Sequence, residues 1–264
     1  MIDAVPVGVV LALCLAAFAA GWIDSVVGGG GVIQLPALLI GLPPSTSVPT
    51  VAGTNKLAAI AGTAIASATY VRKVHIGWRL TVLVAATAYG GSTLGAHLIG
   101  YLPRVAFTPI IIVAVAALGV YTWRRPQLGQ QTRLRHAGTP AHWVLAGALG
   151  LVCGLWDGFV GPGTGVFLVI GFVGLLGYGF LEATTISKLA NLATNAAALL
   201  VFGLQGDVLW KVGACMAVAN LAGGALGSRM AVVHGNQFIR RVFLVAVVAV
   251  EAKLAYDLIV SLVG

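Results

Sequence analysis

The stretch Gly21-Trp-Ile-Asp-Ser-Val-Val-Gly-Gly-Gly-Gly-Val-Ile-Gln-Leu-Pro36 carries a carboxylate inside an apolar run and then four consecutive glycines. A matching stretch stands in the second half of the chain, Trp156-Asp-Gly-Phe-Val-Gly-Pro-Gly-Thr-Gly165. Asp24 and Asp157 are 133 positions apart (157 − 24), about half of the 264-residue chain. Each half of the chain therefore contains an acidic residue followed by a glycine-rich break.

Further residues recur at almost the same interval. Lys56 and Lys188 are 132 positions apart (188 − 56), as are Trp78 and Trp210 (210 − 78). Two small-residue motifs correspond in the same way, Gly91-Ser-Thr-Leu-Gly95 and Gly223-Gly-Ala-Leu-Gly227. The chain is one module written twice, and doubling of an apolar module is how transporters build a two-sided binding site.

The composition indicates a membrane protein. Hydrophobic residues make up 59% of the chain, charged residues only 8%, and mean hydropathy is +1.00. About a quarter of the residues of a soluble domain are charged, and a soluble fold of this size could not bury so much apolar surface. The apolar runs are long and do not alternate, so we predict an all-α integral membrane protein.

We expect eight to ten transmembrane helices, some of them short, glycine-broken or re-entrant. Full crossings of a core about 30 Å thick are predicted at 49–71, 79–104, 104–124, 184–204, 208–228 and 238–262. Each half also begins with two shorter apolar stretches around its glycine break, at 5–23 and 32–42, and at 143–156 and 166–181. Whether 32–42 and 143–156 cross fully or re-enter is left open by their length.

The positive charges predict the orientation. Ten of the fifteen Lys and Arg residues fall in three loops, at 72–79, 124–135 and 229–241. Loops rich in positive charge stay in the cytoplasm. The repeat counterparts of two basic loops, around 205–210 for 72–79 and around Arg104 for 229–241, are poor in positive charge, so we predict that the second module is inserted upside down. The net charge of +8 then comes from loops that set the orientation in the membrane, and it does not indicate nucleic-acid binding.

The predicted organisation is a first membrane repeat at 1–125, a cytoplasmic linker at 126–141 and a second membrane repeat at 142–264. Both termini are expected on the outer side of the cell's inner (plasma) membrane. Partners are the lipid bilayer and a small solute, and a homodimer through a small-residue face is an arrangement that the pattern allows.

No metal or cofactor is expected. Cys14, Cys153 and Cys215 lie singly in apolar stretches, and the five histidines show no ligand spacing. An enzyme would need a nucleophile, an acid–base pair or a metal cluster, and no such set is present in the sequence. We therefore expect no catalytic residues.

The two glycine-rich breaks are candidate binding elements. Irregular backbone at membrane depth is tolerated where it lies inside protein or lines a cavity, and a helix that restarts there directs free N–H groups at the cavity. Two inverted breaks would make an anion site near the membrane midplane, whereas the alternative is close helix packing. The candidate residues are Gly29, Gly30, Gly31, Pro162, Gly163 and Thr164.

Polar residues next to the two lysines form a second candidate element. Lys56 follows Thr54 and Asn55, and Lys188 shares a helix face with Asn191 and Asn195. A polar stripe in an apolar helix faces the bundle interior or a pathway, although a lysine can also snorkel to the headgroups. Asp24 and Asp157 are expected to carry protons or to cap the restarted helices.

These segments resemble the two signatures of the TauE/SafE family of membrane permeases. The first signature matches Gly21–Pro36, and the second matches Trp156–Gly165 with Ala183-Thr184, Lys188, Asn191 and Asn195; Thr54-Asn55-Lys56 also fits. The resemblance implies a secondary transporter, typically an exporter, of sulfite, organosulfonates or related sulfur-containing anions. The alternatives are a transporter of a different small anion or metabolite, or a membrane scaffold without transport activity.

Overall fold

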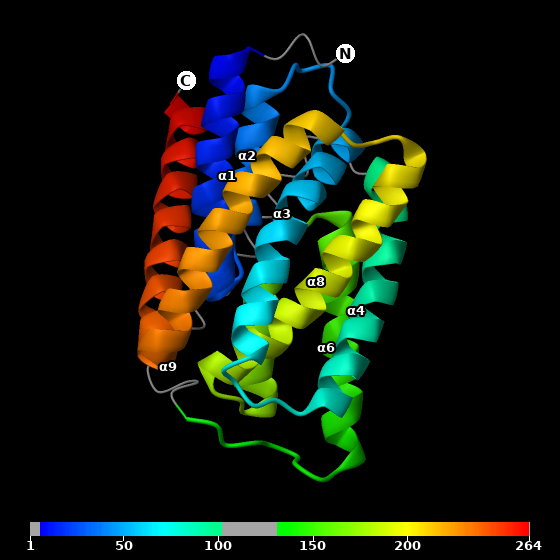
Figure 1. Ribbon diagram of the computed structural model, residues 1–264, viewed down its shortest axis with the longest axis vertical. Coiled ribbons are helices and arrows are strands. Elements are labelled where there is room, and N and C mark those ends of the chain that lie inside the picture. Colours follow the sequence, from blue (N-terminus) through cyan, green and yellow to red (C-terminus); the bar gives the residue numbers. More distant parts are fainter. Residues whose placement is uncertain (1–5, 102–130, 264) are drawn as a thin grey trace.

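The computed structural model describes residues 6–101 and 131–263, the last part (243–244 and 246–263) by its backbone alone (Figure 1). Every regular element in these ranges is helical, and five helices are long and apolar enough to cross a membrane. The prediction of an all-α membrane protein is confirmed. The predicted crossing at 104–124 and the start of the linker lie outside the described residues.

The first half contains α1 (Val7–Val27), α2 (Gly31–Gly41), α3 (Val48–Val71), α4 (Trp78–Leu98) and the 3-10 turn η1 (Ile99–Tyr101). The second half contains α6 (Pro140–Phe159), α7 (Thr164–Gly171), the π-helical turn η2 (Phe172–Leu176), α8 (Phe180–Gln205) and α9 (Trp210–Val263). Non-helical backbone at Gly235 kinks α9 into two parts.

Both lysines lie further from the start of their helices than the sequence predicts, because both helices begin earlier. The stretch 166–181 was expected as one segment, but Gly177 adopts a left-handed conformation and ends η2, so α8 begins at Phe180 and not at Thr184. Ser47 caps α3 by accepting a hydrogen bond from the Thr50 amide, so α3 begins at Val48. Each lysine therefore lies eight residues into its helix (56 − 48 and 188 − 180), which is about 12 Å of rise.

Glycines allow the helices that contain the breaks to pack closely. A Cβ atom added at Gly91 or Gly95 of α4 would lie within 2.3 Å of a backbone oxygen of α6. Likewise, a Cβ added at Gly223 or Gly227 of α9 would lie within 2.5 Å of a backbone oxygen of α1. Both small-residue motifs therefore join helices within the chain, as their spacing suggests.

Figure 1 shows the course of the helices. From their first residues, α1 and α3 run down the view, whereas α6 and α8 run up; α4 runs up, and the first part of α9 runs down. The N- and C-termini lie at the same end of the molecule. The 11-residue α2 spans about 16 Å and is too short for a full crossing.

Candidate functional site

The two glycine-rich breaks meet inside the helical bundle. A Cβ atom added at Gly28 would lie 2.5 Å from the backbone of Gly165, and one added at Gly165 would lie 2.5 Å from Gly28. Gly31 likewise faces Pro162. Gly28 also has a positive φ of 89°, which glycine adopts without strain. The close packing expected as the alternative to a site is therefore present, and it holds the two breaks together.

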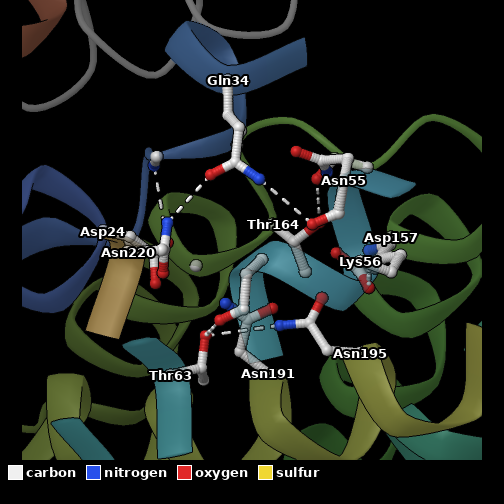
Figure 2. A pocket seen from close by; sticks show the side chains of 17 residues that line it. Asp24, Gln34, Asn55, Lys56, Thr63, Asp157, Thr164, Asn191, Asn195 and Asn220 are labelled. Carbon is white, nitrogen blue, oxygen red and sulfur yellow. Dashed lines mark hydrogen bonds and ion pairs between the residues drawn. The ribbon is translucent and has the colours of Figure 1, made fainter. Parts of the chain in front are cut away.

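A polar cavity lies beside this crossing (Figure 2). Its volume is about 30 Å³, which is room for roughly two or three waters. Except for Ala59, the lining consists of glycines and of polar or charged side chains. The side chains come from both halves: Asp24, Gln34, Asn55, Lys56 and Thr63, and Asp157, Thr164, Asn191, Asn195 and Asn220.

Each half supplies the lysine for the carboxylate of the other half. Lys56 Nζ on α3 lies 2.5 Å from Asp157 Oδ2 on α6, and Lys188 Nζ on α8 lies 2.9 Å from Asp24 Oδ2 on α1. Lys56 is 3% exposed and Lys188 is 0% exposed. Snorkelling to the headgroups is therefore wrong for both lysines. This pairing is not predicted from the sequence. The summed formal charge of the four residues is zero.

In the first half, one hydrogen bond agrees with the capping role expected for the aspartates. The Gly30 amide, at the start of α2, donates to Asp24 Oδ1 over 3.4 Å. In the second half, the Thr164 hydroxyl donates to the carbonyl of Gly161, and Trp156 Nε1 donates to the carbonyl of Pro162. The two breaks are thus stabilised by different local contacts.

Some of the predicted site residues line the cavity and others do not. Gly30, Gly31, Asn55, Lys56, Gly163, Thr164, Asn191 and Asn195 line it. Gly29, Thr54, Pro162 and Lys188 are not among the lining residues. Thr54 instead joins α3 to the turn before α9, because its hydroxyl oxygen accepts a hydrogen bond from the Leu209 amide.

Seven lining residues are not predicted from the sequence: three glycines (Gly28, Gly161 and Gly165) and four residues with side chains (Gln34, Ala59, Thr63 and Asn220). Asn220 Nδ2 donates to Gln34 Oε1 over 2.8 Å and to the carbonyl of Ala17, and Gln34 Nε2 donates to the carbonyl of Asn55. Asn195 Nδ2 donates to the Thr63 hydroxyl. Thr63 and Ala59 are the repeat counterparts of Asn195 and Asn191 (195 − 63 and 191 − 59 are both 132), so the interval contained the signal.

One polar atom at the cavity has no partner. Asn55 is 4% exposed, and its Oδ1 accepts no hydrogen bond from the part of the chain that the structure describes. A buried carbonyl oxygen without a donor is costly. Together with two buried ion pairs and the backbone breaks, it shows that polar groups gather around the cavity inside an apolar helical bundle, where such groups are typically functional.

Long apolar helices, paired charges at membrane depth and a polar cavity between two broken helices define a multi-pass membrane transporter. The chain belongs to the Sulfite exporter TauE/SafE family, whose model matches residues 13–254.

Curated relatives have similar length. The chain is 36% identical over 249 residues to the "Probable membrane transporter protein ORF9" of a Sinorhizobium species, covering 93% of this chain and 92% of that protein. It is 34% identical over 247 residues to the "Probable membrane transporter protein YfcA" of Escherichia coli K12, covering 93% and 89%. A "Probable membrane transporter protein" of Haemophilus influenzae is 34% identical over 242 residues, covering 91% and 92%. No solved structure matches the chain.

Proposed function

We propose that the protein exports a small sulfur-containing oxyanion, such as sulfite, from the cytoplasm by alternating access. The observation that supports the proposal is the cavity at the crossing of the two glycine breaks, which is lined by Lys56 and by side-chain amides from both halves. The family name supports sulfite as the first solute to test.

The lining favours a compact inorganic oxyanion over an organosulfonate. Oxyanions bind through charge-assisted hydrogen bonds from ammonium, amide and hydroxyl groups. Such donors surround the cavity in Figure 2: Asn55 and Lys56 lie at one end, and Asn191, Asn195 and Thr63 lie along one side. Ala59 alone offers an apolar side chain to the tail of an organic sulfonate. A larger solute would need a conformation of the protein in which this cavity is wider.

The inverted arrangement of the two repeats is part of the proposal. It is supported by the opposite courses of α1 and α6, and of α3 and α8, in Figure 1. Together with the basic loops, it puts the 126–141 linker in the cytoplasm and both termini outside the inner membrane. Rocking of one repeat against the other would then open the cavity to each side in turn.

Flux of radiolabelled sulfite in proteoliposomes tests the proposal. We expect uptake that the Lys56→Met variant loses, and no uptake of an unrelated neutral solute of similar size. Gly90→Ala is the matched control, because an added Cβ at this exposed α4 position meets no atom within 4 Å. Wild-type vesicles that take up another solute but no sulfite would reject the substrate.

A further inference from the structure

The two ion pairs between the halves occupy different places relative to the cavity. Lys56 and Asp157 both line it, so a solute in the cavity can reach both members of this pair. In the other pair only Asp24 lines the cavity, and Lys188 is fully buried behind it. The two pairs are repeat counterparts in the sequence, but a solute in the cavity can reach both members of only one of them.

Resting on the proposed function, we propose that the Lys56–Asp157 pair couples anion binding to the uptake of one proton. The substrate anion replaces Asp157 at the Lys56 ammonium group, and the released carboxylate takes a proton from the water on the side to which the cavity opens. When the anion is monovalent, as hydrogen sulfite is, one negative and one positive charge enter together and the charge of the site is unchanged. The Lys188–Asp24 pair stays intact and positions the first break.

The physical reason is the burial of Asp157, which is 3% exposed. A buried carboxylate that loses its ammonium partner is an uncompensated charge in a medium of low dielectric. Protonation removes that charge and leaves a neutral carboxyl group. Anion binding at Lys56 and proton binding at Asp157 therefore assist each other, and such linkage is reciprocal.

In the part of the chain that the structure describes, no other charge near Asp157 could replace Lys56. Next to Asp157, Gly158 of α6 packs against Ser92 and Ala96 of α4. The α7 and α8 residues that share the cavity with Asp157 are Gly165, Thr164, Asn191 and Asn195, all uncharged. Cys153, one turn earlier on α6, is a neutral thiol, and Asp24 across the cavity is already paired with Lys188.

Asp24 has a hydrogen-bond partner in addition to its lysine. Its Oδ2 is bound by Lys188, and its Oδ1 accepts from the Gly30 amide at the start of α2. The next residue, Ser25, is fixed through its carbonyl by the hydroxyl of Tyr70. Asp24 is thus a positioning residue that ties α1 to α2 and α8.

The test compares sulfite flux in wild-type, Asp157→Asn and Asp24→Asn proteoliposomes at several transmembrane pH differences. With one coupled proton, the equilibrium sulfite ratio of the wild type shifts about tenfold per pH unit. Free sulfite itself binds protons, which adds a pH dependence of its own. The test is therefore the difference in pH dependence between the variants and the wild type, and not the wild-type value alone. We expect Asp157→Asn to move sulfite with the additional pH dependence lost, and Asp24→Asn to keep that dependence while its thermal stability falls.

Equal pH dependence in Asp157→Asn and wild type would overturn the inference, and so would loss of the dependence in Asp24→Asn alone. If Asp157→Asn does not fold, calorimetric titration of the wild type with sulfite in buffers of different ionisation enthalpy counts the protons bound by the protein. One proton per anion, after subtraction of sulfite's own, is expected, and none contradicts the inference. Absence of any wild-type flux would instead reject the proposed function.

Discussion

Gly28 and Gly165 are in backbone contact although they are 137 positions apart (165 − 28), and a Cβ atom added to either would lie 2.5 Å from the other's backbone. This contact fixes the position of one glycine break against the other. It also places the start of α7 beside the end of α1, so residues of both halves can line one cavity.

The crossing predicts a steric requirement for glycine at position 165. Gly165→Ala should destabilise the protein by about 1–3 kcal/mol and lower sulfite flux, because the methyl group must push the Gly28 backbone away. Thermal unfolding in detergent and flux in proteoliposomes measure the two effects. Gly90→Ala, with an open Cβ site, should leave both unchanged. A Gly165→Ala protein as stable and active as the wild type would argue against the crossing.

The buried pair of Lys188 and Asp24 predicts a strong double-mutant coupling. Lys188→Met alone should cost about 3–5 kcal/mol, because it leaves the Asp24 carboxylate without its cation. Adding Asp24→Asn should recover much of that loss, and a thermodynamic cycle from unfolding measurements gives the coupling energy. The exposed Lys73 is the control, since Lys73→Met should change stability by less than about 0.5 kcal/mol. Additive losses would show that the two residues do not interact.

The side-chain amide of Asn55 predicts an effect on transport with little effect on folding. Asn55→Ala removes an NH2 group that can donate to an oxyanion, together with a carbonyl oxygen that accepts no hydrogen bond in the described part of the chain. Sulfite affinity should therefore fall while the free energy of unfolding changes little. Ser67→Ala is the matched control, because the Ser67 hydroxyl is also buried and unpartnered but does not line the cavity. Equal flux in both variants would mean that Asn55 does not contact the substrate.

The proposed topology predicts opposite accessibility of two loops. In a variant without Cys14, Cys153 and Cys215, a cysteine at Gln205 should react with a membrane-impermeant maleimide in intact cells. One at Lys73 should react only after the membrane is permeabilised, because the proposed topology puts the basic loop in the cytoplasm. Both positions are exposed at helix ends. Labelling of both from the same side would contradict the inverted arrangement.

The helices and the breaks could be predicted from sequence because their causes are local. Long apolar runs and the glycines before α2 and α7 act within a segment, and the 132-residue interval shows the same features in both halves. The start of α8 was missed by four residues (184 − 180), since the left-handed turn at Gly177 allows the helix to begin earlier than the polar stripe suggests.

The partners of the charged residues could not be predicted, because an interval between repeats shows equivalence and not proximity. Lys56 could have paired with either aspartate, and the packing of α3 against the second half decides for Asp157. Gln34 and Asn220 gave still less signal: their counterparts are Phe167 (34 + 133) and Ala88 (220 − 132), so no repetition singled them out.

Anomalous diffraction from crystals grown with selenite, the selenium analogue of sulfite, tests the central claim most directly. The account predicts a selenium peak in the cavity between the two glycine breaks, within hydrogen-bond distance of Lys56 Nζ. Selenium peaks confined to the surface arginines, in a protein that still transports selenite, would contradict it.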